Sequence, residues 1–133
     1  MKFKHLLTVC LSAVMALAVA APSHAGEVPD ISHEELTKAI AAKTVVLLDV
    51  NGTESYKAGH IPGALDFKVV KADLASKLPA DKGALVVAYC GSEQCGAYMK
   101  GVQAAKKLGY TNVKHYSPGL AGWKKSGADL AKG

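Results

Sequence analysis

Arginine is absent from this chain of 133 residues, and all 16 of its basic residues are lysines. Phosphatases and arsenate reductases that use a cysteine nucleophile clamp the equatorial oxygens of their substrate with a bidentate arginine in the loop after that cysteine. In this chain Gly96 occupies the clamping position, six residues after Cys90. The missing arginine therefore excludes this class of cysteine enzyme.

Long runs of like charge are absent as well. The formal net charge is +5, but the lysines are dispersed rather than gathered into a basic tract. Proteins that bind nucleic acids usually carry such a tract or a basic face. We therefore expect no nucleic-acid partner. The chain also has no internal repeat, and its length predicts one domain after an N-terminal leader segment.

The N-terminal segment has the pattern of a secretory signal peptide. Lys2 and Lys4 precede an apolar run over residues 6–21, and small residues follow at the positions that a signal peptidase recognises. The pattern predicts a signal peptide over residues 1–25, cleaved after Ala25; the alternative is an uncleaved membrane anchor. Cleavage would leave a periplasmic or secreted protein with no membrane attachment. Its net charge would fall from +5 to +3, because the two leader lysines are removed.

Residues 26–133, the predicted mature domain, alternate between short apolar segments and segments with helical spacing. Ser32 and Glu35 have the spacing of a capping box, which marks the start of the first helix. This alternation predicts an α/β domain with a mostly parallel sheet, helices on both faces, and ligands at the carboxyl ends of the strands. The predicted helices cover residues 33–42, 70–78, 96–108 and 120–126, and the predicted strands cover 44–50, 64–67, 85–89 and 112–116, with a loop over 51–63.

Cys90 stands at the carboxyl end of the most hydrophobic predicted strand of the mature chain. It begins the loop Cys90-Gly91-Ser92-Glu93-Gln94-Cys95-Gly96, after which a helix is predicted. Main-chain N–H groups of such a loop, and the positive end of the helix dipole, stabilise a thiolate or a persulfide. The sequence therefore predicts that Cys90 is a nucleophile. The alternative is a structural disulfide between Cys90 and Cys95, which an oxidising compartment would permit.

Metal binding and general-base catalysis receive little support from the sequence. A zinc site would need Cys90, Cys95 and two histidines, but the gap between the cysteines and the scattered histidines do not match known ligand spacings. His60 lies in a turn rich in glycine and proline, and a thiolate at a helix N-terminus needs no base to ionise. We predict no metal and a structural role for His60.

Two groups of motifs resemble the rhodanese family. The first half of the family pattern is matched by Asp49-Val50, Glu54-Ser55-Tyr56 and Gly59-His60-Ile61-Pro62-Gly63-Ala64. The second half is matched by Tyr89-Cys90, Ala104-Ala105, Leu108-Gly109-Tyr110, Asn112-Val113, Tyr116, Gly119-Leu120 and Trp123. The resemblance covers essentially all of the predicted mature chain, in order.

The resemblance implies a rhodanese-like three-layer domain, with a mostly parallel five-stranded sheet flanked by helices. It also implies a sulfurtransferase: the Cys90 thiolate takes a sulfane sulfur from a donor, holds it as a persulfide and passes it to a thiol or another nucleophilic acceptor. No metal or organic cofactor is needed, and we expect a monomer. The main-chain N–H groups that would form the cradle for the anion belong to Gly91, Ser92, Glu93, Gln94 and Gly96.

Two departures from the family pattern bear on the sulfur donor. Many thiosulfate-using members carry arginine or lysine in the active-site loop, whereas the loop over residues 90–96 of this chain has no basic residue. In addition, Asn51 stands where the family usually has arginine. Glu93 would repel the oxyanion of thiosulfate by about 1 kcal/mol or less when solvated. A polysulfide or a persulfidated protein is therefore favoured over thiosulfate as the donor. Lys100, about a turn after Cys95, is the nearest basic residue in the sequence that could supply the missing charge.

Cys95 has two interpretations. It could attack a Cys90 persulfide or relay the sulfur to a partner, or it could be a small buried residue that fills space under the loop. Two other functions stay open: a thiol–disulfide redox protein that uses Cys90 and Cys95, and a non-catalytic sulfur carrier for a larger enzyme. The redox interpretation depends only on an oxidising compartment and on the two cysteines being close together, because four residues separate Cys90 and Cys95 instead of the two that separate the cysteines of thioredoxin-like proteins.

Overall fold

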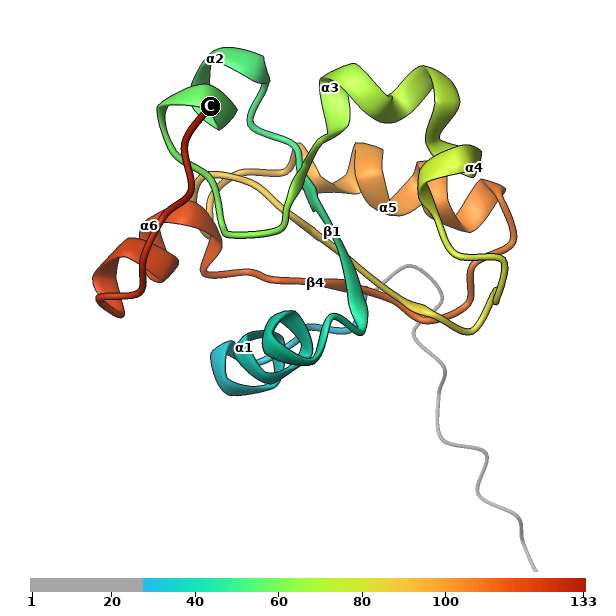
Figure 1. The fold of residues 1–133 in the computed structure, drawn as a ribbon, viewed down its shortest axis with the longest axis horizontal. Coiled ribbons are helices and arrows are strands. Elements are labelled where there is room, and N and C mark those ends of the chain that lie inside the picture. The colour runs from blue at the N-terminus through green and yellow to red at the C-terminus, as the bar shows by residue number, and fades with distance from the viewer. Residues whose placement is uncertain (1–27) are drawn as a thin grey trace, which may run out of the picture.

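The computed structural model describes residues 28–133 (Figure 1), so the predicted signal peptide over residues 1–25 lies outside the described residues. No helix within that described range is long and apolar enough to cross a bilayer. The strands are β1 (Val45–Asp49), β2 (Leu65–Asp66), β3 (Leu85–Tyr89) and β4 (Val113–His115). The helices are α1 (His33–Ala42), α2 (Thr53–Ala58), α3 (Phe67–Val70), the 3-10 helix η1 (Lys71–Asp73), α4 (Leu74–Lys77), α5 (Tyr98–Lys107) and α6 (Gly119–Lys125).

One sheet of parallel strands runs through the molecule in the order β2-β1-β3-β4. The chain leaves β1 towards β2 on one side and leaves β3 towards β4 on the other side. The gap between β1 and β3 is therefore the topological switch point, where open α/β sheets bind their ligands at the carboxyl ends of the strands. Asp49 and Tyr89 are register partners at these two ends, and Cys90 follows directly.

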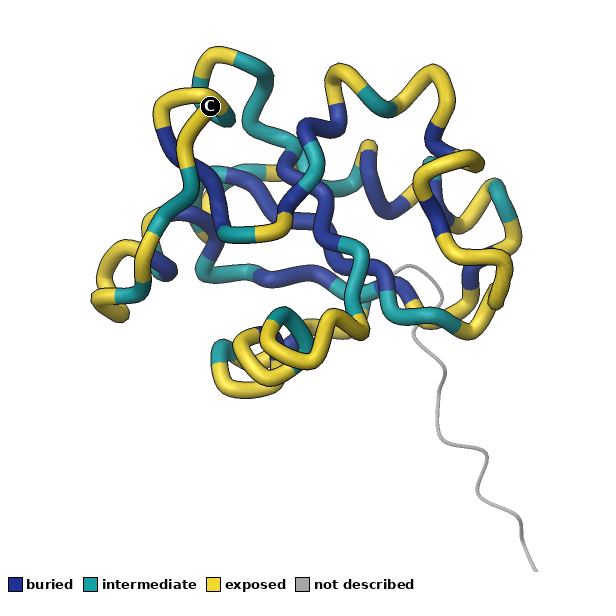
Figure 2. Tube along the Cα trace, viewed as in Figure 1, coloured by how far each residue is buried: buried dark blue, intermediate teal, exposed yellow. Residues whose placement is uncertain are grey.

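Two apolar cores occupy the two faces of the sheet. On one face α1 and α6 contribute Leu36 and Trp123, and on the other face α3 and α5 contribute Phe67 and Val102. Figure 2 shows the strands as buried segments enclosed by helices with exposed outer sides. The three-layer α/β arrangement expected from the sequence is confirmed.

The sheet of the described residues has four strands rather than the five that the resemblance implied. Beside β4, where a further strand would lie, the chain forms a single parallel bridge between Asp30 and His115. The N–H of Ile31 donates to the carbonyl oxygen of His115, and the N–H of His115 donates to the carbonyl oxygen of Pro29, each at 2.9 Å. Because Pro29 has no N–H to donate to β4, the ladder stops at this bridge.

The predicted capping box is present at the start of α1. The hydroxyl of Ser32 accepts from the N–H of Glu35 at 3.2 Å, and the carboxylate of Glu35 accepts from the N–H of Ser32 at 3.1 Å. These two bonds satisfy donors that a helix start leaves unpaired. The helix therefore begins where the sequence predicts.

Two segments differ from their predictions. The predicted loop over residues 51–63 contains α2, and the predicted helix over residues 70–78 begins earlier, at Phe67, and is divided into α3, η1 and α4. Asp73 leaves helical geometry at φ −131°, and its carboxylate accepts a 2.5 Å hydrogen bond from the hydroxyl of Ser76. Short polar side chains that bond locally compete with helix hydrogen bonds, which explains the interruption.

Candidate active site

Cys90 lies at the end of the central strand β3, and the residue is only 1% exposed. Its sulfur turns towards the loop that follows: the Sγ atom lies 3.1 Å from the carbonyl oxygen of Cys95. Neither of the two apolar cores of the described residues includes Cys90. The side chain therefore faces the loop rather than the hydrophobic interior.

The start of α6 fixes the orientation of the loop's first peptide groups. The N–H groups of Leu120 and Ala121 donate to the carbonyl oxygens of Cys90 and Gly91, both at 2.9 Å. In a planar trans peptide, the C=O of one residue and the N–H of the next point in opposite directions. The N–H groups of Gly91 and Ser92 therefore point away from α6.

Most main-chain N–H groups of the loop have no acceptor among the described residues. Of the loop N–H groups over residues 91–96, only that of Cys95 donates to another group of the described chain, the carbonyl oxygen of Ser92 at 3.1 Å. Free main-chain N–H groups that converge on one place form an anion-binding concavity. The N–H groups that remain available belong to Gly91, Ser92, Glu93, Gln94 and Gly96.

The side chains of the loop point elsewhere. Those of Ser92, Glu93 and Gln94 line a shallow hollow of about 230 Å³ together with residues of α6 and Pro118. Glu93 and Gln94 are exposed. The side chains of this part of the loop, including that of Glu93, therefore lie on the side of α6.

Gly119 allows α6 to approach the loop this closely. Its φ angle is +61°, in the left-handed region that favours glycine, and a Cβ atom at this position would lie 2.5 Å from the carbonyl oxygen of Cys90. In the sequence, Gly119-Leu120 is only one match to the family pattern. The sequence does not predict that Gly119 lets α6 approach Cys90, because a single glycine does not reveal which main chain it lies against.

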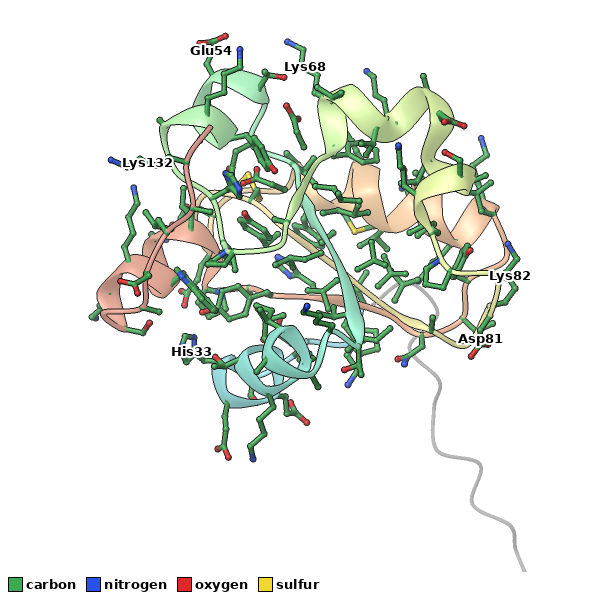
Figure 3. The ribbon with its side chains drawn as sticks, in the orientation of Figure 1. His33, Glu54, Lys68, Asp81, Lys82 and Lys132 are labelled. Atoms are coloured by element: carbon green, nitrogen blue, oxygen red, sulfur yellow. A yellow bond between two sulfur atoms is a disulfide. The ribbon has the colours of Figure 1, made fainter. Side chains whose placement is uncertain are left out.

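Cys90 and Cys95 form a disulfide, with their Cα atoms 6.2 Å apart; the disulfide sulfurs are drawn in yellow in Figure 3. A Cα separation of this size is usual for a disulfide and needs no movement of the backbone. The structure is therefore that of the oxidised protein. A sulfur bonded in this way cannot act as a nucleophile until thiol–disulfide exchange reopens it.

A buried hydrogen-bond network joins the strand ends that precede the cysteine loop. The hydroxyl of Tyr89 accepts from the N–H of Ile61 at 3.0 Å and donates to Asp49 Oδ2 at 2.6 Å, and Asp49 Oδ1 accepts from the N–H of Asn51 at 2.8 Å. Burial, followed by the hydrogen bond and charge of Asp49, raises the pKa of Tyr89 far above its ordinary value. The phenol therefore stays protonated. The network connects β1, β3 and the turn at Ile61 and positions the loop that leaves β3.

His60 has the contacts of a structural residue. Its ring stacks on Tyr56 with 3.7 Å between centroids, and Nδ1 lies 2.7 Å from the carbonyl oxygen of Tyr56. Its main chain pairs with that of Ala131 through two 2.9 Å hydrogen bonds. These contacts fit the structural role predicted for His60.

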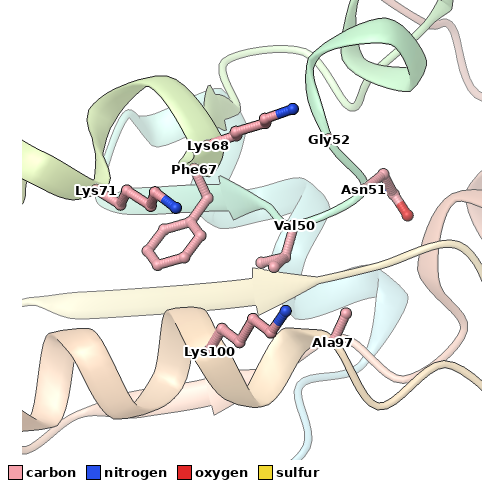
Figure 4. Close-up of a pocket in the computed structure, with 8 residues that line it drawn as sticks. All are labelled: Val50, Asn51, Gly52, Phe67, Lys68, Lys71, Ala97 and Lys100. Atoms are coloured by element: carbon pink, nitrogen blue, oxygen red, sulfur yellow. The ribbon is translucent and has the colours of Figure 1, made fainter.

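A pocket of about 290 Å³ is lined by Ala97, the residue directly after the cysteine loop, and by Asn51; Figure 4 shows the residues that line it. Asn51 lies close to both the pocket and the cysteine loop: it lines the pocket, and its Oδ1 lies 3.4 Å from the position that a Cβ atom on Gly91 would take. The described residues contain no cluster of three or more histidine, cysteine or acidic side chains that could hold a metal ion. The pocket is lined by Val50, Asn51, Gly52, Phe67, Lys68, Lys71, Ala97 and Lys100.

Comparison with known proteins indicates the family. A family model described as a rhodanese-like domain matches residues 32–126. The chain is 31% identical over 108 residues to the thiosulfate:glutathione sulfurtransferase of Homo sapiens, a match that covers 71% of this chain and 92% of that protein. It is 34% identical over 119 residues to an HTH-type transcriptional regulator of Mycobacterium tuberculosis, covering 88% of this chain. That match covers 51% of the regulator, so the chain spans about half its length.

Solved structures agree on the fold. A human single-domain sulfurtransferase has a TM-score of 0.58 at 25% identity, covering 74% of this chain and 97% of that one. A thiosulfate sulfurtransferase from Pseudomonas aeruginosa has a TM-score of 0.65 at 24% identity, covering 80% of this chain and 20% of that one. At this identity the second likeness concerns the fold alone.

Proposed function

This chain belongs to the rhodanese-like family, and on that premise we propose that it is a sulfurtransferase whose Cys90 carries a sulfane sulfur as a persulfide. The observation that carries the proposal is the loop after β3, where the carbonyl oxygens of Cys90 and Gly91 are bonded to α6 and free N–H groups remain. Fixed N–H donors stabilise an anion without reorganisation. A persulfide anion is the species that this family chemistry would place there.

The proposed reaction has two displacement steps. First, the Cys90 thiolate attacks the outer sulfur of the donor; the new S–S bond forms as the donor's own bond to that sulfur breaks, and the remainder of the donor leaves with the electron pair. Second, an acceptor thiolate attacks the outer sulfur of the persulfide, and Cys90 leaves as a thiolate. The sulfur passes from donor to acceptor, and the enzyme returns to its starting state.

The disulfide gives Cys95 a place in this scheme. The Cys95 thiolate would attack Cys90 Sγ of the persulfide, form the Cys90–Cys95 disulfide and release hydrosulfide. Two molecules of an external thiol would then restore both cysteines and leave as their disulfide. The disulfide itself supports this role, because it requires the two sulfurs to come within bonding reach.

The donor that we favour is a polysulfide or a persulfidated protein. The loop carries no basic side chain, and Glu93 is its only ionisable side chain apart from the cysteines. A donor without a sulfonate needs no cation in the loop, so the lack of a basic side chain there does not disfavour it.

Turnover by the reduced protein tests the proposal. With polysulfide or thiosulfate as donor and 2-mercaptoethanol as acceptor, we expect sulfide release by wild type and by Cys95→Ser, and none above background by Cys90→Ser. Initial rates should follow ping-pong kinetics, because the donor fragment leaves before the acceptor reacts. Turnover by Cys90→Ser equal to wild type would overturn the assignment.

The disulfide also favours a second candidate, a thiol–disulfide redox protein. That function needs both cysteines, whereas sulfur transfer through Cys90 needs one. Cys95→Ser therefore separates the two: retained sulfur release supports the sulfurtransferase, and loss of all turnover together with disulfide exchange by wild type supports the redox protein. A sulfur carrier without catalysis would load once and show no repeated turnover.

Export is part of the proposal. The leader pattern over residues 1–25 supports a mature domain, residues 26–133, in the periplasm or outside the cell. N-terminal sequencing of the protein recovered from that fraction tests this, and the expected first residue is Gly26. A first residue of Met1 would contradict cleavage.

A further inference from the structure

We propose that the pocket beside the cysteine loop binds the carboxylate groups of a small thiol that accepts sulfur from Cys90. This inference rests on the proposed function, since it names the acceptor class of the same site. The pocket lies between Asn51, at the end of β1, and Lys100, on α5. The acceptor's thiolate would attack the outer sulfur of the persulfide while its carboxylates stay in the pocket.

Three ammonium groups give the pocket its charge. Lys68 comes from α3, Lys71 from η1 and Lys100 from α5. In Figure 4, Lys71 and Lys100 extend into the pocket from opposite sides, and Lys68 extends towards Gly52. Lys68 and Lys71 are three residues apart, whereas Lys100 is distant from both in the sequence, so the fold is what brings Lys100 to the same pocket.

No carboxylate of the described residues lies within ion-pair distance of these three lysines. The lining of the pocket contains no aspartate or glutamate. Within the described residues, ion pairs form only between Lys38 and Glu34 and between His115 and Asp30. Three ammonium groups that no described carboxylate pairs with favour an anionic ligand and increase its rate of encounter.

Asn51 marks the end of the pocket that is next to the cysteine loop. It lines the pocket, and its Oδ1 lies 3.4 Å from the position that a Cβ atom on Gly91 would take. The acceptor's thiolate would therefore meet the persulfide at this end of the pocket.

The size of the pocket favours an organic anion over a small inorganic one. Its volume of about 290 Å³ is roughly that of ten water molecules at about 30 Å³ each. Val50 and Phe67 give it apolar walls. A dicarboxylate with a short carbon chain would fill this space and contact both the lysines and the apolar walls, whereas thiosulfate would leave most of it empty.

Binding to Cys90→Ser tests the pocket independently of sulfur transfer, because this variant cannot load sulfur on position 90. The probe is (methylthio)succinate, which carries two carboxylates and no reactive thiol, titrated by NMR or calorimetry. We expect saturable binding that Lys68→Gln, Lys71→Gln and Lys100→Gln each weaken by about two- to five-fold, as measured for exposed ion pairs. The matched control is Lys106→Gln, an exposed lysine of α5 outside the pocket, which should leave binding unchanged. Equal binding by all variants would overturn the proposal.

A charge series of acceptors tests the same pocket in sulfur-loaded Cys95→Ser, in which no second cysteine can resolve the persulfide. Mercaptosuccinate should discharge the persulfide faster than thioglycerol at low salt, and Lys100→Gln or added salt should reduce that difference. Equal rates for the two thiols would overturn the inference while leaving the sulfurtransferase intact. A lysine effect confined to the KM for thiosulfate would also overturn it, because the pocket would then serve the donor. Failure of Cys95→Ser to load any sulfur would refute the proposed function instead, and the binding result with Cys90→Ser would still stand.

Discussion

The hydroxyl of Tyr89 donates a 2.6 Å hydrogen bond to Asp49 Oδ2, so the last residues of β3 and β1 are joined by their side chains directly before the cysteine loop. Both residues are fully buried. Because burial holds the pKa of Tyr89 above its usual range, the phenol acts as a permanent donor to the carboxylate. This pair fixes the two strand ends from which the loop at Cys90 and the residue Asn51 depart.

Tyr89→Phe should destabilise the protein. The substitution leaves Asp49 Oδ2 and the N–H of Ile61 without their partner, and we expect a loss of about 3 kcal/mol from the free energy of unfolding. The control is Tyr56→Phe, which removes a hydrogen bond to the carbonyl oxygen of Ala64 at a less buried position and should cost about 1 kcal/mol. Urea denaturation measures both. A smaller loss for Tyr89→Phe than for Tyr56→Phe would contradict the proposed importance of the buried pair.

Gly119→Ala should displace the cysteine loop. The new Cβ atom would lie 2.5 Å from the carbonyl oxygen of Cys90 at a φ of +61°, and we expect a loss of about 3 kcal/mol together with slower sulfur loading. Gly127→Ala is the control, because Gly127 also has a positive φ, +80°, but open space around it. It should cost about 1 kcal/mol and leave loading unchanged. Equal effects of the two substitutions on loading would show that contact with Cys90 is not what matters.

The disulfide predicts how the protein responds to reductant. Oxidised wild type should load no sulfur, because Sγ of Cys90 is bonded to Cys95, and reduction should expose two further thiols and allow loading. Cys95→Ser should load without prior reduction. Thiol titration and a loading assay, each with and without reductant, measure this. Rapid loading by protein shown to be fully oxidised would mean that the disulfide does not close the site.

His115 should make stability depend on pH. Burial lowers its pKa, and the charge of Asp30, whose carboxylate lies 3.9 Å from Nδ1, opposes this shift only in part; the ring also stacks on Tyr98. The unfolded chain takes up a proton near the usual pKa of about 6.5, whereas the folded ring takes it up only at lower pH. Stability is therefore full above that value and falls as the pH decreases below it.

His115→Gln should flatten this dependence between about pH 7.5 and pH 5.5, the interval around the usual histidine pKa. His33→Gln, at a more exposed position on α1, should leave it in place. Thermal unfolding at a series of pH values measures the slope. An unchanged slope in His115→Gln would assign the dependence to another group.

Local sequence signals were sufficient for much of the fold. The capping box at Ser32 and the apolar runs of β1 and β3 depend on neighbouring residues and on burial of both strand faces, so a sequence contains them directly. The interruption at Asp73 and the single bridge at Asp30 were not predictable in the same way. At Asp73 a side-chain hydrogen bond competes with the hydrogen bonds of a helix, and at Asp30 the sheet ladder ends after one bridge. A sequence does not show which of the competing hydrogen bonds forms in the folded chain.

The candidate site was predictable only in part. Cys90 and its loop follow from the order strand, cysteine, glycine, helix, and the structure places them together at the switch point between β1 and β3. The close approach of Gly119 to Cys90, and the position of Lys71 opposite Lys100 across the pocket, join residues from separate elements. No local pattern encodes such contacts, which depend on how α3, α5 and α6 pack on the sheet.

The most direct test of the central claim is the intact mass of the reduced protein after incubation with polysulfide. We expect Cys95→Ser to gain the mass of one sulfur atom, located on Cys90 by peptide mapping and removed by added thiol, and Cys90→Ser to gain none at that position. Wild type should load in the same way and then lose the sulfur as hydrosulfide when Cys95 closes the disulfide. No gain of sulfur by Cys95→Ser, or the same gain in Cys90→Ser, would contradict the account.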